Sequence, residues 1–537
     1  MDCTWRVLSS VVLGILALAG AAAAADVATT LVDDNPYHTH TPGQRFQIGV
    51  RHNYTGVGHI TGRWRDFQGN PLGELVLLAQ GQTTWLDSPS GDIGYYGLYF
   101  DSDDPGVVFN RNTGFRREFG FTILPTLYLL ERSTKPDSAF GLVHADIDDP
   151  YLQPGYIKTM TVQQFSDSAP WAAQMEDRRK RGLIEVPLQA SSTWSGDSTR
   201  PVRTDELAAR AAEMRRVFAA APSTLYWELG LEENLWPGSA GTYYWENLAA
   251  KFAAVKKAAG EINPATRLIY QIEGFDYSFF RKFFESSAAV QVDILSLHPY
   301  RWEGGFPSPE TWLAAHLDAI RGMMQQPGAV KRIWITEVGA PIRDTPELNG
   351  FFGYPTTGVA VKGQTREANV LYMIKMYVLA LSMGVEKVFW YSYRDWGSDV
   401  SAAEDHFGLV DYWGFPKPAY AAYAQLIQRL DGKRYSRSLD LPEGPIQAHE
   451  FVGEHEDCFV LWTYPERRQQ VMLDSLRPGL TPEQVVSVTT AVGSPVAPLG
   501  AELTVTGAPV FVVVRSSDSG SRDEKIERGR WRPIIRR

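Results

Sequence analysis

LYWELGLEENLW, residues 225–236, is an apolar stretch that becomes acidic toward its carboxyl end. A second stretch, IWITEVG at residues 333–339, is also apolar and also ends close to a carboxylate. Short apolar runs of this kind are typical of strands that are buried on both faces, as in parallel sheets. The two stretches therefore predict two strands of one α/β domain, each with a glutamate where the strand meets solvent.

The pattern around these two stretches predicts a barrel. From about residue 139 onward, apolar strand-like runs alternate with amphipathic helical segments, which indicates parallel β/α units. Strands are expected at 140–146, 157–162, 183–188, within 225–236, and at 267–272, 292–300, 333–339 and 386–393. Helices are expected at 204–220, 243–258, 277–286, 309–324, 366–383 and 418–430. Eight strands over about 290 residues match a (β/α)8 TIM barrel, whose functional residues lie at the carboxyl ends of the strands.

The rest of the chain is predicted to form smaller units. Residues 1–25 resemble a cleaved signal peptide, which predicts a secreted or periplasmic protein with no stable membrane insertion after cleavage. Short β-prone runs separated by turn signals predict small β-sandwich domains at 26–136 and 432–516, on either side of a barrel at 137–431. The last segment, 517–537, is rich in Ser, Asp and Arg and is expected to be a disordered basic tail.

Charge and cysteine content exclude several classes. The formal net charge of −10 argues against a nucleic-acid binder, which needs a basic face. Removal of the signal peptide would leave Cys458 as the one cysteine of the mature chain, so no internal disulfide is expected. No His/Cys/Asp cluster has metal-site spacing and no Gly-rich loop suits a phosphate, so neither a metal nor a cofactor is predicted.

The two terminal glutamates suggest a reaction. Side chains alternate across a strand with period two, so Glu228, Gly230 and Glu232 are expected on one face of their strand and Ile333, Ile335 and Glu337 on one face of the other. Glu232 and Glu337 can then both point at the barrel axis. Two carboxylates about 5–5.5 Å apart suit glycoside hydrolysis with a covalent intermediate.

The motifs resemble those of clan A glycoside hydrolases, and within that clan of family 39. WELGLEENLW at 227–236 is similar to the strand-4 pattern Tyr-Glu-Ile-Trp-Asn-Glu-Pro-Asn-Leu-Trp, and ITEVG at 335–339 is similar to the strand-7 nucleophile motif. HPY at 298–300, VFWY at 388–391 and FGLV at 407–410 add to the resemblance, which covers about residues 139–430.

The resemblance implies roles for individual residues. Glu232 would be the general acid/base, Glu337 the nucleophile, and Tyr300 a neighbour that steadies the charge of Glu337. His298 would orient the acid/base or a sugar hydroxyl, with a purely structural role as the alternative. Trp390 would form the floor of the sugar subsite, because its flat apolar face suits stacking. Four further residues are expected to contact the ligand or line the cleft: His144, Asp146, Asn234 and Trp236.

Two residues depart from the clan pattern. Leu231 replaces the Asn that usually bonds the sugar 2-hydroxyl, and Glu233 replaces a Pro. The loss of the Asn leaves three alternatives: a sugar modified at position 2, a hydrogen-bond donor from another strand, or a barrel that only binds glycan. Glu233 becomes an alternative acid if the strand register is shifted by one residue, and Glu228 is expected to be a structural residue inside the barrel.

The sequence thus predicts a retaining glycoside hydrolase that cleaves a polysaccharide or glycoconjugate by double displacement. The alternative is a non-catalytic glycan-binding or exopolysaccharide-assembly protein on a degenerate barrel. The expected partner is a carbohydrate, and the sequence leaves the oligomeric state open.

Overall fold

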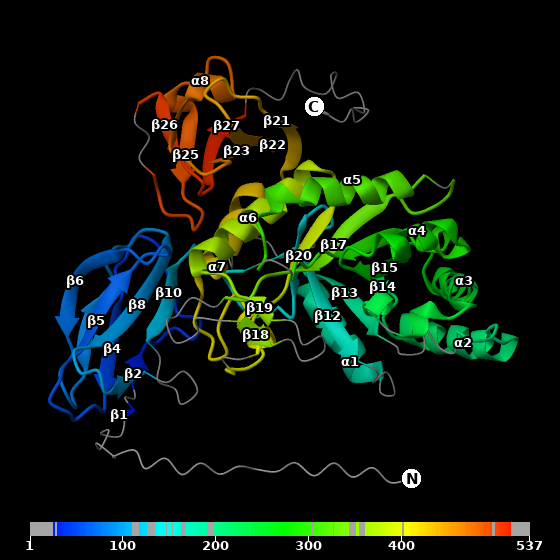
Figure 1. The fold of residues 1–537 in the computed structure, drawn as a ribbon, viewed down its shortest axis with the longest axis horizontal. Helices are drawn as coiled ribbons and strands as arrows, with labels where there is room; N and C mark the ends of the chain where they lie inside the picture. Colours follow the sequence, from blue (N-terminus) through cyan, green and yellow to red (C-terminus); the bar gives the residue numbers. More distant parts are fainter. Residues whose placement is uncertain are drawn as a thin grey trace, which may run out of the picture.

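The computed structural model of the chain describes most of the three predicted domains (Figure 1). The described residues are 25–26, 29–109, 117–125, 135–145, 148–152, 154–162, 168–190, 198–235, 237–302, 305–325, 327–342, 351–353, 360–399, 402–496 and 500–516. Asp146, Trp236, nearly all of the predicted signal peptide and the predicted basic tail lie outside these residues.

The central domain is a closed barrel of eight parallel strands, which confirms the predicted (β/α)8 fold. Strand β20 pairs with both β17 and β11 and so closes the sheet on itself. In barrel order the strands are β11 (Phe140–Val143), β12 (Tyr156–Val162), β13 (Ile184–Ala190), β14 (Tyr226–Leu229), β15 (Arg267–Glu273), β16 (Ile294–His298), β17 (Arg332–Val338) and β20 (Lys387–Trp390).

Helices surround the barrel close to the predicted positions (Figure 1). They are α1 (Ser168–Lys180), α2 (Thr204–Ala220), α3 (Tyr244–Ile262), α4 (Tyr277–Glu285), α5 (Leu313–Met323), α6 (Arg366–Ser382) and α7 (Pro418–Leu430). Helix α1 was not predicted. The segment 309–324 is not one helix, because a 3-10 turn (Pro309–Thr311) precedes α5. Among the described residues, no helix combines the length and apolar character that a membrane span requires.

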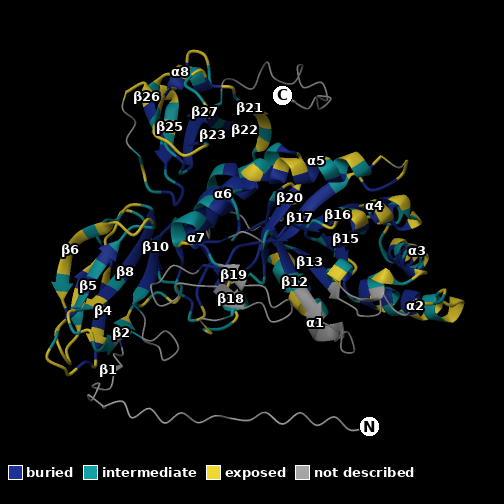
Figure 2. Cartoon of the chain, viewed as in Figure 1, coloured by how far each residue is buried: buried dark blue, intermediate teal, exposed yellow. Residues whose placement is uncertain are grey.

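The barrel interior is layered. Near the amino ends of the strands, aromatic rings from non-adjacent strands meet: the Tyr156 ring lies 5.7 Å from the Trp334 ring and 6.2 Å from the Phe389 ring. Two residues further along these strands, Lys158 and Thr336 form a polar layer, where both contact Glu228. Most of the barrel strands are drawn as buried in Figure 2. An apolar plug therefore lies below a polar layer that leads to the carboxyl ends.

This layering corrects the face expected for β17. Trp334 and Thr336 point into the barrel, since their side chains meet those of strands across it. Because neighbours along a strand alternate, Ile333 and Ile335 face the helices, contrary to the prediction that they share the inner face with Glu337. The pairing of β17 with β20 shifts register between Ile335 and Val338. An irregularity of this kind re-aims side chains at a barrel rim.

The amino-terminal domain packs two sheets against each other, antiparallel except for the parallel pair β3–β10. One sheet has the order β3-β10-β8-β5-β6 and the other β2-β4-β7. Ile48, Leu98, Phe100 and Phe121 are among the fully buried residues between them. The strands are β2 (Thr29–Val32), β3 (Thr39–His40), β4 (Gln47–His52), β5 (Ile60–Arg65), β6 (Pro71–Leu77), β7 (Thr84–Asp87), β8 (Gly94–Ser102) and β10 (Glu118–Ile123), with β1 (Ala25–Asp26) pairing β9 (Val107–Val108).

The carboxyl-terminal domain is a second small β structure with its own core. Its main sheet has the order β21-β22-β23-β27-β25, and β24 pairs with β26. The elements are β21 (Arg434–Ser438), β22 (Ile446–Val452), β23 (Glu456–Thr463), β24 (Gln469–Met472), α8 (Leu473–Leu476), β25 (Val485–Thr489), β26 (Glu502–Val505) and β27 (Val510–Arg515).

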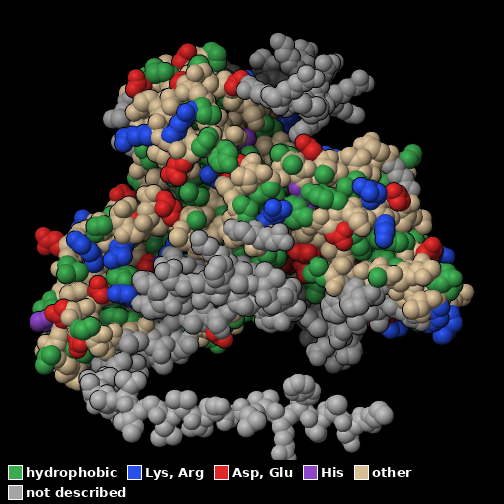
Figure 3. All heavy atoms as spheres, viewed as in Figure 1, with side chains coloured by type: hydrophobic (Ala, Val, Ile, Leu, Met, Phe, Trp, Pro, Cys, Tyr) green, Lys and Arg blue, Asp and Glu red, His purple; other side chains and the backbone are tan. Residues whose placement is uncertain are grey.

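On the face drawn in Figure 3, Lys and Arg are scattered among Asp and Glu rather than gathered in one basic patch.

Candidate active site

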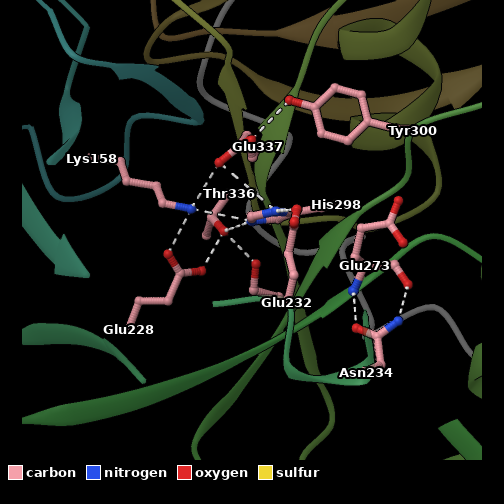
Figure 4. Close-up of polar contacts among 10 residues, drawn as sticks. Lys158, Glu228, Glu232, Asn234, Glu273, His298, Tyr300, Thr336 and Glu337 are labelled. Atoms are coloured by element: carbon pink, nitrogen blue, oxygen red, sulfur yellow. Dashed lines mark hydrogen bonds and ion pairs between the residues drawn. The ribbon is translucent and has the colours of Figure 1, made fainter. Parts of the chain in front are cut away.

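Glu232 is placed by a turn and not by its strand. Strand β14 ends at Leu229, and the chain then passes through two left-handed conformations, with φ of 78° at Gly230 and 47° at Glu232. The expected period-two alternation from Glu228 to Glu232 therefore stops before it reaches Glu232. The turn instead brings the Glu232 carboxyl back over the barrel, where Oε1 lies 2.9 Å from His298 Nδ1 (Figure 4).

Glu337 lies near the end of β17 in a polar pocket. Tyr300 Oη donates a hydrogen bond of 3.0 Å to its Oε1, and Lys158 Nζ lies 3.4 Å from its Oε2. The Glu337 side chain is 11% exposed and the Glu232 side chain 24% exposed, so both carboxyl groups can be reached from solvent. The two glutamates predicted from the sequence meet at the carboxyl end of the barrel.

The distance between the two carboxyl groups bears on the type of reaction. A carboxylate oxygen of Glu232, one of Glu337 and a ring nitrogen of His298 all lie within 4.8 Å of one another. Retaining glycosidases hold their carboxyl groups about 5–5.5 Å apart, whereas inverting enzymes keep them about 6.5–9.5 Å apart to admit a water molecule. The nearest oxygens of Glu232 and Glu337 are thus closer together than the separation that inverting enzymes keep.

Lys158 and His298 lie inside the barrel and link the carboxyl groups of Glu232 and Glu337 through a chain of close contacts. Lys158 is completely buried, and its Nζ lies 2.8 Å from Glu228 Oε2 and 3.2 Å from His298 Nε2. His298 is also completely buried and lies 3.1 Å from Thr336 Oγ1. Glu228 is thus a structural partner inside the barrel, as expected, because it balances the charge of Lys158.

The electrostatics make the two glutamates unequal. Burial, together with the charges of Glu337 and Glu273, raises the pKa of Glu232 well above its usual value. Burial also raises the pKa of Glu337, but Lys158 and the Tyr300 hydroxyl act in the opposite direction. Burial and the Lys158 charge lower the pKa of His298 well below 6.5, so its ring is neutral near pH 7. A proton shared by the pair is therefore held on Glu232.

A third carboxylate, Glu273, lies at the end of β15 and was not predicted. Burial raises its pKa to about 7, against the effect of a hydrogen bond from Trp302. Its position at the end of the apolar run RLIYQIE matches the pattern that singled out the other two glutamates. The signal was therefore present in the sequence, but no motif pointed to it.

Asn234 holds Glu273 in place. Its Nδ2 donates to the Glu273 carbonyl and its Oδ1 accepts from the Glu273 amide, both at 3.0 Å (Figure 4). The 3-10 turn η3 (Glu233–Leu235) is thereby fixed to the end of β15. The expectation that Asn234 also lines the cleft stays a prediction.

Glu233 does not reach the barrel mouth. Its carboxylate is buried and accepts a hydrogen bond of 2.8 Å from Tyr244 on α3. Burial raises its pKa to about 7. The shifted register that would have made Glu233 the acid is therefore wrong.

Trp390 does not form the floor of the pocket. Its side chain is fully buried, and its ring lies 6.3 Å from that of Tyr372 on α6. Because Phe389 points into the barrel, its neighbour Trp390 points outward to the helices. The prediction of a sugar-stacking role for Trp390 is wrong, since strand parity was not visible from the motif alone.

Other aromatic side chains lie near the mouth. The Trp396 side chain is 54% exposed, and its ring meets the His144 ring edge to face at 5.2 Å. Burial and Lys158 lower the pKa of His144 to about 4. On the β16 side, Trp302 stacks on Tyr300 with ring centroids 5.1 Å apart. The ligand contact expected of His144 stays a prediction, and Trp302 and Trp396 were not predicted.

Three ligand atoms, one each from Glu232, His298 and Glu337, are close enough together to reach a single metal ion. Lys158 Nζ lies 3.4 Å from Glu337 and 3.2 Å from His298. An ammonium group at these distances repels a divalent cation and occupies the lone pairs that the cation would need. The donor set therefore does not fit a metal ion.

Comparison with known proteins rests on structure, because no family model and no curated protein matches the sequence. One solved structure, a family 39 glycoside hydrolase from the gut symbiont Bacteroides cellulosilyticus WH2, aligns over 89% of this chain and 99% of its own length, with a TM-score of 0.62 and 16% identity. The chain has the fold of that hydrolase. The resemblance to family 39 predicted from the motifs is confirmed at the level of the fold.

Two weaker likenesses involve other glycosidases. A GH30 endoxylanase from Clostridium papyrosolvens C71 aligns over 72% of this chain and 98% of its own, with 14% identity and a TM-score of 0.44. A β-D-glucuronidase for Dictyoglomus thermophilum aligns over 75% and 68%, with 14% identity and a TM-score of 0.37. Scores this low give no information about the residues of this site.

Proposed function

We propose that the chain is a retaining glycoside hydrolase that cleaves a polysaccharide or glycoconjugate. The observation that carries this proposal is the short separation of Glu232 and Glu337 at the carboxyl end of the barrel, within 4.8 Å. The fold shared with a family 39 glycoside hydrolase supports it. The predicted signal peptide adds the proposal that the enzyme acts outside the cytoplasm.

The reaction uses the two glutamates in turn. Glu337, ionised beside Lys158 and Tyr300, attacks the anomeric carbon while Glu232 gives its proton to the departing glycosidic oxygen. The sugar is then bound covalently to Glu337. Glu232, now ionised, takes a proton from a water molecule that attacks the anomeric carbon, releases the sugar and restores both residues.

The stereochemistry of the product provides a direct test. Wild-type protein is screened against aryl glycosides and glycan oligomers, and NMR identifies the anomer that forms first. We expect retention of configuration, and we expect Glu337→Gln to lose turnover without loss of the folded state. Glu232→Gln should lose turnover on natural glycans but still form the covalent intermediate from aryl glycosides with good leaving groups, because that first step needs no acid for them. An inverted product, or full activity of Glu337→Gln, would exclude the mechanism.

The glycan-binding alternative depends on Leu231, which stands where the clan usually has Asn. In that case, wild type and Glu337→Gln would bind the same oligomer with the same affinity, and neither would cleave it. Calorimetric titration of both proteins with one oligomer distinguishes this outcome from turnover.

A further inference from the structure

The buried Lys158 contacts both halves of the proposed catalytic pair, and its hydrogen-bonding capacity has a consequence for His298. An ammonium group has three N–H donors and no acceptor. Its three neighbours are Glu228 Oε2 at 2.8 Å, His298 Nε2 at 3.2 Å and Glu337 Oε2 at 3.4 Å (Figure 4). All three neighbours must therefore accept.

This requirement fixes the tautomer of His298. A neutral imidazole carries a proton on one nitrogen and a lone pair on the other. If Nε2 accepts from Lys158, the proton is on Nδ1, and Nδ1 donates to Glu232 Oε1 at 2.9 Å. Thr336 Oγ1, 3.1 Å from Nε2, donates its own proton to Glu228 and so offers Nε2 only a lone pair. The Lys158 donor outweighs this neutral contact, because hydrogen bonds from a charged group are roughly twice as strong as neutral ones.

The tautomer in turn determines which oxygen of Glu232 is available. Glu232 Oε1 accepts the Nδ1–H hydrogen bond at 2.9 Å, so a proton on Oε1 itself would clash with that N–H. We propose that Lys158 is a positioning residue that holds His298 in its Nδ1-protonated tautomer, so that Glu232 carries its transferable proton on Oε2. This proposal rests on the proposed function of Glu232 as the general acid.

The opposite tautomer would reverse the geometry. With the proton on Nε2, the ring would donate to Thr336 Oγ1 but would also turn an N–H toward the Lys158 ammonium, and Nδ1 would accept a hydrogen bond from the protonated Glu232. The proton of the acid would then point at His298 rather than at the leaving group. One buried lysine thus steadies the charge of Glu337 directly and directs the proton of Glu232 through His298.

The tautomer can be measured without any substrate. In full-length protein labelled with 15N-histidine, the His298 signals, assigned by comparison with His298→Asn, show which ring nitrogen is protonated. We expect a neutral ring protonated on Nδ1 at pH 7. A ring protonated on Nε2 would overturn the proposal, even if the protein proved to be an active retaining glycosidase.

Two substitutions at position 298 separate positioning from packing. Asn places an amide N–H near the position of Nδ1, whereas Gln places its amide near Nε2, and both are uncharged. We expect His298→Asn to retain turnover of alkyl glycosides within about tenfold and His298→Gln to lose about 100-fold, the usual range for general acid catalysis. On dinitrophenyl glycosides, which need no acid, the two variants should differ by less than about threefold.

The result on poor leaving groups decides the outcome. Equal losses by both variants on alkyl and dinitrophenyl glycosides would mean that His298 only supports the fold, and would overturn the proposal. A third variant, Lys158→Met, removes the donor to Nε2 at similar length. We expect its His298 signal to lose the Nδ1-protonated form; if Lys158→Met does not fold, the position-298 pair and the wild-type tautomer still decide the question.

Discussion

Glu232 and Glu233 are neighbours in sequence, and their carboxyl groups lie in different surroundings. Glu232 turns over the barrel mouth toward His298, whereas Glu233 turns away and bonds Tyr244. The pKa of both groups is raised by burial. For Glu232 the raised pKa suits a proton donor, because an acid must hold its proton at the working pH. For Glu233 the same shift is only a cost to stability.

The cost at Glu233 can be measured as a pH-dependent stability. Its pKa is about 7 in the folded protein against an ordinary 4.5, so the folded state holds the proton more tightly than the unfolded state. Below pH 4.5 Glu233 is protonated in both the folded and the unfolded state, so it costs no stability. The free energy of unfolding then falls as the pH rises, and above about pH 7 the loss is complete, on the order of 3 kcal/mol. We expect Glu233→Gln, whose amide still accepts from Tyr244, to unfold at a higher temperature than wild type at pH 8 and at the same temperature at pH 4.

Thermal unfolding at both pH values tests this prediction. Glu261→Gln, at an ion pair with Arg215 in which each side chain is 41% exposed, serves as a control that should unfold close to wild type at both pH values. Glycosidase activity of Glu233→Gln should be unaffected. An equal change in unfolding temperature at pH 4 and pH 8 would show that the Glu233 carboxyl group is not the source.

At the scale of the element, the turn between β14 and η3 positions the acid. Gly230 adopts φ of 78°, a conformation that a side chain disfavours, and a Cβ there would lie 3.2 Å from Glu233 Cγ and Oε1. Asn234 fixes the other end of the turn to Glu273. The turn is therefore held at both ends, which keeps Glu232 at a fixed distance from Glu337.

Gly230→Ala should disturb this turn. A left-handed conformation costs an alanine about 1–2 kcal/mol, and the contact with Glu233 adds to that cost. We expect stability to fall by about 2 kcal/mol and turnover to fall more than tenfold, because the Glu232 carboxyl group moves. Unfolding curves and steady-state kinetics measure the two effects.

Gly260→Ala is the matched control for that substitution. Gly260 lies in helix α3, and a Cβ there would meet no atom within 4 Å. Alanine is favoured over glycine in a helix by about 0.5–1 kcal/mol, so this variant should be slightly more stable and fully active. Unchanged stability and turnover of Gly230→Ala would mean that the turn does not hold the acid.

At the scale of the whole molecule, the two β domains are attached to the barrel through helices α6 and α7. Arg366, at the start of α6, pairs with Glu118 of the amino-terminal domain. In the carboxyl-terminal domain, Trp462 Nε1 donates to Glu310 Oε1 at 2.9 Å, and the same oxygen lies 2.8 Å from Lys375 Nζ on α6. These contacts hold both β domains near α6 and α7, as Figure 1 shows.

Glu310→Gln should weaken the attachment of the carboxyl-terminal domain. The Lys375 and Glu310 side chains are 8% and 3% exposed, so the substitution leaves a nearly buried ammonium without its counter-charge. Breaking one partner of a buried pair costs about 3–5 kcal/mol. We expect a lower unfolding temperature, with kcat close to wild type at temperatures where the variant is folded.

Trp462→Phe isolates the hydrogen bond from the ion pair. This variant keeps the Lys375–Glu310 pair, so its loss should combine about 1 kcal/mol for the indole hydrogen bond with the cost of a smaller ring at a fully buried position. Equal stability of Glu310→Gln and wild type would show that the carboxyl-terminal domain does not depend on this contact.

Much of the fold follows from local patterns in the sequence. Strand runs and helix periodicity depend on residues close together in the chain, and these patterns predicted the eight strands and six of the seven barrel helices within a few residues. Glu232 and Glu337 were found for the same reason, since each follows an apolar run at the place where a barrel strand ends.

The tertiary structure decided how the site is assembled. Lys158, Glu273 and His298 come from strands β12, β15 and β16, and barrel closure brings them beside Glu232 and Glu337. This closure also decides which face of β17 points inward, that Trp390 points outward, and that Glu233 has surroundings separate from those of Glu232. Local periodicity gives the spacing of faces along a strand, but the choice of the buried face is settled by packing against residues far away in the chain. The sequence therefore determined the barrel and its two glutamates, and only the closed barrel determined which charges and hydrogen bonds act on them.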